Sequence, residues 1–164
     1  LEYYEKSLAI YKKVFGENHP DTAWSYHNIG LVYYSQGDYT EALEYYEKSL
    51  AVTERDLDEN QLLAATIYNN IGTVYYSQGD HARALEYYQK ALVISEKVFG
   101  ENHPDTAISY NNIGSVYKFQ GDYAQALEYY EKALVIREKV FGENHQSTLR
   151  IKRIIARLEL LIKG

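Results

Sequence analysis

The nine residues Phe15-Gly16-Glu17-Asn18-His19-Pro20-Asp21-Thr22-Ala23 decide the fold, because the chain uses them again. The same nine residues stand at 99–107, and the first five of them stand at 141–145. The spacing from Phe99 to Phe141 is 42 residues, and the spacing from Phe15 to Phe99 is 84 residues, which is two such steps. Self-similarity at a fixed period of this length is the sequence signature of a repeat protein. The chain is therefore built from units of 42 residues.

Each unit contains two helical patterns separated by a Gly-Asp pair. In the first unit, apolar and aromatic residues recur at helical spacing from Tyr26 to Tyr33 and again from Ala42 to Leu50. Gly37, between them, suits the left-handed conformation that ends many helices, and Asp38 can cap the helix that follows. We call the first helix of a unit its A helix and the second its B helix. Each unit is thus predicted to form an antiparallel helical hairpin.

A glycine lies inside every A helix, at Gly30, Gly72 and Gly114. Glycine in a helix interior costs about 1 kcal/mol relative to alanine, so a packing reason is needed. We expect close approach of the B helix, through Ala42 in the first unit, to supply that reason.

These patterns predict an all-α fold, a right-handed α-solenoid (superhelix) of stacked antiparallel helix hairpins. One solenoid is expected to span residues 1–164. Its predicted parts are a half repeat with a B helix only at 1–19, full repeats at 20–61, 62–103 and 104–145, and a C-terminal capping helix at 146–164.

The second linker departs from the pattern. Residues 57–63 lack both the glycine that ends the B helix and the proline that begins the next A helix. Two interpretations stay open: the linker is repacked around Leu62 and Leu63, or it contacts a partner.

Composition and charge exclude several classes of protein. Seventeen Lys and Arg against 23 Asp and Glu give a net charge of −6, which disfavours nucleic acid as a partner, since phosphate binding needs clustered positive charge. The chain has no cysteine, which excludes disulfides and thiolate metal sites. No apolar stretch approaches the roughly 18 residues of a membrane span, so a cytoplasmic location without membrane contact is expected. The absence of methionine, even at position 1, indicates a segment of a longer protein.

Neither the histidines nor the carboxylates predict catalysis. Three of the five histidines occupy the same linker position, one or two periods apart, where a structural role is expected. We find no phosphate loop, zinc-binding His-Glu-x-x-His or nucleophile-elbow motif. The chain is therefore predicted to be no enzyme and to need no metal or cofactor.

The A and B patterns resemble the tetratricopeptide repeat, which also pairs two helices and places Gly-Asp-Tyr at the turn. The 42-residue unit, its Gly-x-x-His-Pro-x-Thr-Ala linker and Tyr-Asn-Asn-Ile-Gly in helix A resemble the kinesin light chain-like subclass. The resemblance implies an adaptor that binds extended peptides in a concave groove lined by A helices. It also implies that Asn28, Asn70 and Asn112 form a ladder along the peptide backbone; the alternative is that these asparagines bridge adjacent helices.

The candidate groove residues lie on the stripe beside the buried face of each A helix. They are His27 and Tyr34 in the first unit, Asn69 and Tyr76 in the second, Asn111 and Lys118 in the third, and Arg150, Arg153 and Arg157 in the last helix. The three arginines predict a positive end of the groove. Their alternative role is the solvated face of a capping helix.

The predicted function is a non-catalytic protein–protein interaction module that binds an extended, acidic peptide segment in this groove. The alternative is an architectural or self-assembling repeat array that acts through its open ends. Leu1, Tyr4 and Leu8 present a B-helix stripe without an A helix before it, so a homo-oligomer through this N-terminal helix, or fraying of the helix, is also predicted.

Overall fold

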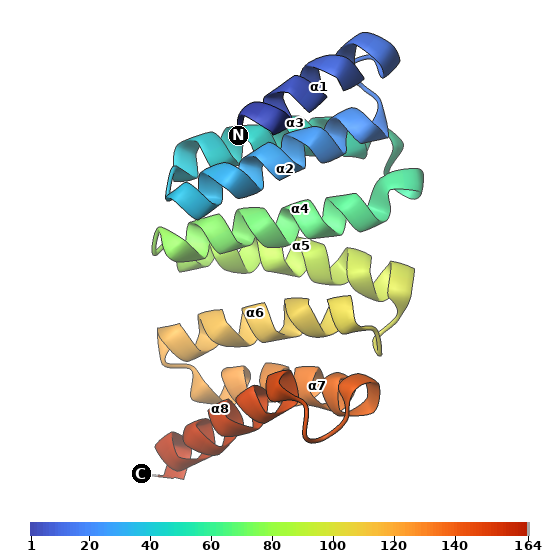
Figure 1. Cartoon of the computed structure of the whole chain (residues 1–164). Coiled ribbons are helices and arrows are strands. Elements are labelled where there is room, and N and C mark those ends of the chain that lie inside the picture. Colours follow the sequence, from blue (N-terminus) through green and yellow to red (C-terminus); the bar gives the residue numbers. More distant parts are fainter. Residues whose placement is uncertain (164) are drawn as a thin grey trace. The chain divides into compact units, whose positions relative to one another are not determined.

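The computed structural model describes residues 1–163, except for the side chains of residues 56–59. Within that part of the chain every regular element is a helix, and successive helices pack as antiparallel pairs (Figure 1). The elements are α1 (Glu2–Phe15), α2 (Pro20–Gln36), α3 (Tyr39–Thr53), the short 3₁₀ helix η1 (Glu54–Asp56), α4 (Leu57–Ser77), α5 (His81–Phe99), α6 (Pro104–Gln120), α7 (Tyr123–Phe141) and α8 (Gln146–Lys163). The all-α hairpin prediction is confirmed.

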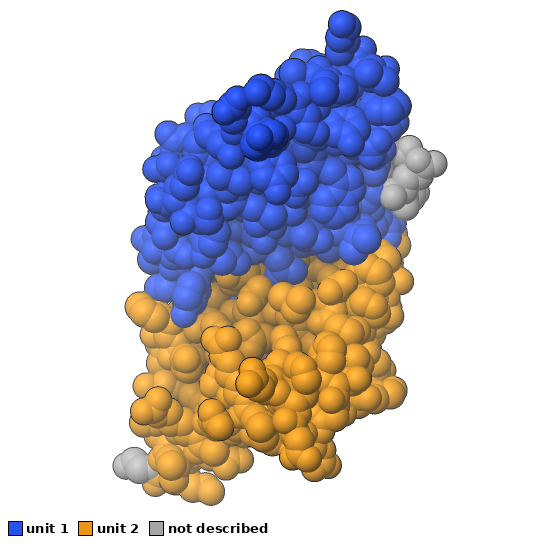
Figure 2. Space-filling view, in the orientation of Figure 1, with its two compact units in different colours: residues 1–87 blue, residues 88–164 orange. Residues whose placement is uncertain are grey.

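The chain forms two compact units, residues 1–87 and residues 88–164, which Figure 2 shows in different colours. From here on, 'unit' means one of these two compact parts, and each 42-residue segment is called a repeat. In the first unit α1 packs on α2, α2 on α3 and α3 on α4. The ring of Tyr75 on α4 stacks on that of Tyr87 on α5, with centroids 5.5 Å apart. In the second unit α6 packs on α7 and α7 on α8. The predicted single solenoid and its repeat boundaries stay predictions, and Gly164 of the predicted capping helix lies outside the described residues.

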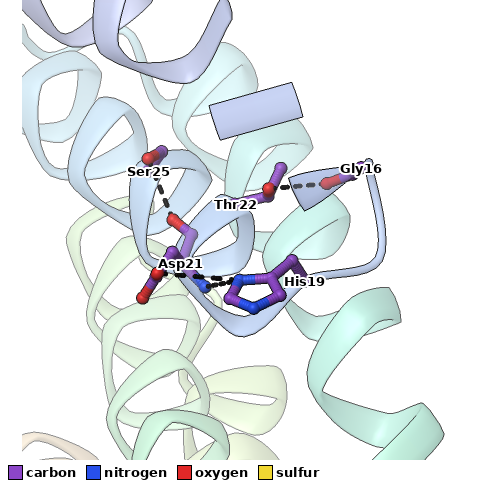
Figure 3. A network of polar contacts seen from close by, with 5 residues as sticks. All are labelled: Gly16, His19, Asp21, Thr22 and Ser25. Carbon is purple, nitrogen blue, oxygen red and sulfur yellow. Dashed lines mark hydrogen bonds and ion pairs between the residues drawn. The ribbon is translucent and has the colours of Figure 1, made fainter. Parts of the chain in front are cut away.

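The linker histidine caps the A helix that follows it. His19 Nδ1 accepts a hydrogen bond from the backbone N–H of Asp21 at 3.2 Å, and His103 does the same for Asp105 at the same distance. In the first linker the Thr22 hydroxyl also donates to the carbonyl of Gly16 at 2.7 Å (Figure 3). These contacts satisfy groups that a helix start leaves without partners. Since the sequence predicted a structural role for the repeated histidines, that interpretation is confirmed for these two.

The glycine inside the A helix makes room for a tyrosine ring. A Cβ atom added at Gly30 would lie 2.6 Å from Cε1 of Tyr46, which is fully buried on α3. Gly114 faces the equivalent ring of Tyr130 on α7 at 3.2 Å. The expectation of a closely approaching B helix is correct, but the side chain that requires glycine is Tyr46, not Ala42.

Helix α4 begins at Leu57, but its backbone leaves helical geometry at Asn60, with φ −113° and ψ 16°. The long helical segment after this kink therefore starts at Gln61, one residue before the predicted start of the second full repeat at Leu62. Because the linker has neither a glycine stop nor a proline start, it forms a kink between two helical segments and not an open loop. Leu63 is buried while Leu62 is 48% exposed, so the linker packs around one of the two predicted leucines. The side chains of the predicted linker residues 57–59 lie outside the described part.

Candidate functional site

In the first unit, the neighbouring A helices α2 and α4 contact each other through a polar pair. His27 Nε2 lies 2.8 Å from the side-chain nitrogen of Asn70, and the His27 ring is only 4% exposed. Burial lowers the pKa of His27, and the side chain of Asn28, which favours the protonated ring, partly opposes that shift. The structure thus brings together three of the predicted site residues, and two of them bridge adjacent helices.

Two tyrosines predicted to line the groove are half-buried and held by neighbours. The hydroxyl of Tyr34 on α2 lies 3.2 Å from the hydroxyl of Ser77 on α4. The ring of Tyr76 meets that of His81 edge-on, with centroids 5.1 Å apart. Asn69, the remaining candidate of this unit, is half-buried on α4. These side chains present aromatic and amide surface, and contacts with neighbouring side chains hold the two tyrosines in place.

The second unit contains a cationic cleft between α6 and α8. We use this name for a cavity of about 350 Å³ lined by Lys118, Arg150, Arg153, Ile154, Arg157, Leu158 and Leu161. All four cationic residues are exposed, whereas Leu158 is 1% exposed and anchors α8 in the core. Arg150, Arg153 and Arg157 fall at helical spacing on one side of α8, as the sequence predicted. Among the described residues lining this cleft, none carries a carboxylate.

A second cavity, of about 380 Å³, lies among α6, α7 and the start of α8. Asn111 and Arg150 line it, so the structure brings together two more of the predicted residues. Arg137 on α7 also lines it, and sequence reasoning missed this residue because it belongs to a B helix. Asn112 is half-buried on α6, where its side chain lines neither cavity.

The described residues give no support to metal chemistry or membrane insertion. No group of three or more histidine or acidic side chains among them is placed to hold a metal ion. Of the helices searched in that same part of the chain, none combines the length and hydropathy that a bilayer crossing requires.

Comparison with protein families identifies the repeat. The tetratricopeptide repeat model matches residues 1–55, 63–139 and 110–163. The chain belongs to the tetratricopeptide repeat family. Proteins of this family are typically non-catalytic, their repeat domains generally mediate protein–protein interactions, and no catalytic family is indicated. A search of curated proteins found no match.

Solved structures with the same fold include kinesin light chain-like proteins. BtubC (BKLC) from P. vanneervenii superposes with a TM-score of 0.80 at 22% identity, covering 99% of this chain and 73% of the other. A putative kinesin light chain from Podospora anserina, with nearly identical TPR-like repeats, gives a TM-score of 0.77 at 24% identity, covering 96% and 74%. The apo form of RapI gives 0.84 at 22% identity, covering 99% and 56%. The resemblance to tetratricopeptide repeats and to kinesin light chain-like structures is thus confirmed, and these likenesses concern the fold.

Proposed function

We propose that this chain is a non-catalytic protein–protein interaction module that binds an extended, acidic peptide segment of another protein on the surface lined by its A helices. The observation that carries the proposal is the cationic cleft, where Lys118 on α6 and three arginines on α8 surround an aliphatic floor. The rest of the chain is acidic, since the net charge is −6 overall. Positive charge is therefore concentrated at this cleft.

The chemistry of the cleft suits an acidic peptide that also carries an apolar side chain. Guanidinium groups bind carboxylates through two parallel hydrogen bonds, which gives geometry as well as attraction. Ile154 and Leu161 offer apolar surface to the side chain next to the acid. The cavity volume of about 350 Å³ falls at the lower end of the range of about 300–1,000 Å³ that is usual for ligand pockets.

The asparagines and tyrosines on the A helices have different proposed roles in peptide binding. Asn70 already uses its amide to contact His27, which favours the bridging role for that position. Asn28, Asn112, Asn69 and Asn111 keep their proposed role as partners of a peptide backbone. Tyr34 and Tyr76 would supply rigid contact area at low entropic cost.

The test is a titration of the chain into a fluorescein-labelled peptide of alternating glutamate and leucine residues. The variant Arg153→Gln/Arg157→Gln removes two cations of the cleft, and Lys13→Gln/Lys139→Gln removes two exposed lysines that line neither cavity. We expect the arginine variant to weaken binding about tenfold, since each exposed guanidinium–carboxylate pair contributes up to about 1 kcal/mol and a loss of about 1.4 kcal/mol is tenfold. The lysine variant should change the affinity by less than about twofold, because distant surface charges are screened.

Salt and sequence controls complete the test. Affinity should fall steeply from about 0.01 M to about 1 M salt, over which the Debye length drops from about 30 Å to about 3 Å. A peptide with glutamine in place of glutamate should bind far more weakly. Binding that is insensitive to salt, or equal losses in the two double variants, would refute the cleft as the binding surface.

A second candidate, self-association, is favoured by the exposed apolar side chains of α1. None of its residues is buried, and Tyr3, Ile10 and Val14 are each more than half exposed. We propose that a second copy of the chain covers this face. Sedimentation should then show a concentration-dependent dimer that Ile10→Glu abolishes, and a strict monomer at high concentration would exclude it.

A further inference from the structure

The second cavity contains an arginine whose surroundings leave it without a hydrogen-bond partner on one side. Nε of Arg137 is buried and makes no hydrogen bond. Burial lowers the pKa of Arg137, and the neighbouring charge of Arg150 lowers it further. A buried donor normally has an acceptor, and a guanidinium close to a second cation lacks the anion that would stabilise both. Arg137 is thus partly buried beside a second cation, an arrangement that a bound anion would stabilise.

Comparison of the repeats shows that both arginines belong to this part of the chain alone. Stepping back by 42 residues, Arg137 corresponds to Ser95, and one further step leads to Thr53. Both of these small side chains are buried in their B helices. Arg150 corresponds to Ile108 in the preceding A helix. Two neutral positions of the repeat have therefore become cationic where they line one cavity.

The linker beside the cavity also differs from the other linkers in a way that favours negative charge. The first and third linkers carry Asp21 and Asp105, whose carboxylates lie 3.6 Å and 3.7 Å from Nδ1 of the preceding histidine. The equivalent residue of the last linker is Ser147, whose hydroxyl lies 2.7 Å from Nδ1 of His145. The acid that would repel an anion is thus replaced by a neutral hydroxyl. Three substitutions relative to the other repeats act together, each making the cavity more favourable for negative charge.

The groups that line the cavity match the donor set of a phosphate site. Two guanidiniums can each donate to two oxygens of one oxyanion, and together they neutralise two negative charges. His145, Gln146 and Ser147 form the start of α8, a helix of 18 residues whose N-terminal end carries partial positive charge. His145 Nδ1 accepts from the backbone N–H of Ser147 at 3.3 Å, so the neutral ring carries its proton on Nε2 and can donate. Among the described residues that line the cavity, none is acidic.

We infer that the cavity between Arg137 and Arg150 binds a phosphate group, carried by a phosphorylated side chain of the peptide partner. A carboxylate brings one negative charge and leaves the two arginines partly uncompensated, whereas a phosphate monoester brings nearly two. Arg150 lines both the cavity and the cationic cleft, so a bound phosphate would lie directly beside the surface proposed for the acidic peptide. The carrier, though not the phosphate site itself, rests on the proposed function.

The first experiment uses inorganic phosphate alone, titrated into the chain by calorimetry at about 0.15 M chloride, where the Debye length is about 8 Å. The variants take their residues from the other repeats: Arg137→Ser, Arg150→Ile and Ser147→Asp. Each should weaken phosphate binding about tenfold or more, because each removes a charged hydrogen bond or adds a repelling acid. The controls are Lys13→Gln and Lys139→Gln, since these exposed lysines line neither cavity. Both should stay within about twofold of the unmodified chain.

Absence of saturable phosphate binding to the unmodified chain would overturn the inference. Equal losses in Lys139→Gln and in Arg137→Ser would also overturn it, because they would show that phosphate responds to the overall charge of the chain and not to a defined site. Circular dichroism checks that every variant folds, and Ser147→Asp, which alters a half-buried linker residue, keeps the test valid if Arg137→Ser does not fold.

The second experiment tests whether the phosphate group is carried by a peptide, separately from whether the cavity binds phosphate at all. The glutamate–leucine peptide is compared with versions that hold one phosphoserine, or serine, in place of a central glutamate. The phosphoserine peptide should bind more tightly than the serine peptide, and Arg137→Ser should abolish that gain while leaving the binding of the serine peptide unchanged. If inorganic phosphate binds but no peptide does, the proposed peptide function fails and the phosphate site stands. If the peptides bind and phosphoserine gives no gain, the phosphopeptide inference fails and the proposed function stands.

Discussion

His27 on α2 and Arg153 on α8 occupy the same position of the 42-residue repeat, three steps apart, and their environments are opposite. His27 is 4% exposed and contacts Asn70 of the neighbouring A helix. Arg153 is exposed and lines the cationic cleft. One helix position is therefore buried in the first unit and lines an open cleft in the second. The repeat sets the backbone, while the individual side chain decides whether a position packs internally or faces solvent.

The largest expected difference between the two units concerns the glycine in the A helix. In Gly30→Ala the new Cβ would lie 2.6 Å from the ring of Tyr46, which is fully buried and has no room to move. We expect the free energy of unfolding to fall by up to about 3 kcal/mol, as for other overpacked cores. Gly114→Ala should cost clearly less, because the contact with Tyr130 is 3.2 Å and alanine improves helix propensity by about 1 kcal/mol.

Urea denaturation followed by circular dichroism measures both variants. Equal losses of unfolding free energy in Gly30→Ala and Gly114→Ala would contradict the prediction, because the added Cβ lies 2.6 Å from the tyrosine ring in the first case and 3.2 Å in the second.

Removal of Asn70 is the next largest effect. Asn70→Ala leaves the buried His27 ring without its partner on α4, and an unsatisfied buried group costs about 1–2 kcal/mol of stability. The control is Asn111→Ala, since Asn111 is half-buried and lines an open cavity. That change should cost less than about 0.5 kcal/mol, as usual for surface positions. Thermal denaturation compares the two, and a larger loss in Asn111→Ala would contradict the bridging role of Asn70.

Much of the fold could be predicted from the sequence because its signals are local. Pro20 and Pro104 begin α2 and α6, as expected for prolines in the first turn of a helix. The short helical segment before the kink at Asn60 was not predicted, because the linker there has lost both of its local signals. The Tyr46 ring that requires Gly30 was not predicted, since periodicity identifies the packed face but not which side chain fills a given space.

The candidate site was predictable where helical spacing alone decides it. Arg150, Arg153 and Arg157 share one cleft because they lie on one side of a single helix. The burial of His27 was not predictable, since its partner Asn70 lies 43 residues away and the contact depends on how two A helices pack. Arg137 was missed although a signal existed, namely that it replaces buried hydroxyl residues at the equivalent positions of the earlier repeats.

The smallest expected effect is the pH dependence that His27 gives to the first unit. Burial lowers the pKa of His27 below its ordinary value of 6.5, and the side chain of Asn28 acts in the opposite direction. The unfolded chain therefore binds more protons at this residue than the folded chain, so the free energy of unfolding decreases as the pH falls below about 6.5 and stops decreasing below the folded pKa. The variant His27→Asn takes the residue that the second and third repeats carry at this position, Asn69 and Asn111. We expect it to flatten the stability profile between about pH 7 and pH 5. Urea midpoints across this range measure the difference, and parallel profiles for the variant and the unmodified chain would show that the His27 ring takes up its proton as easily in the folded state as in the unfolded one.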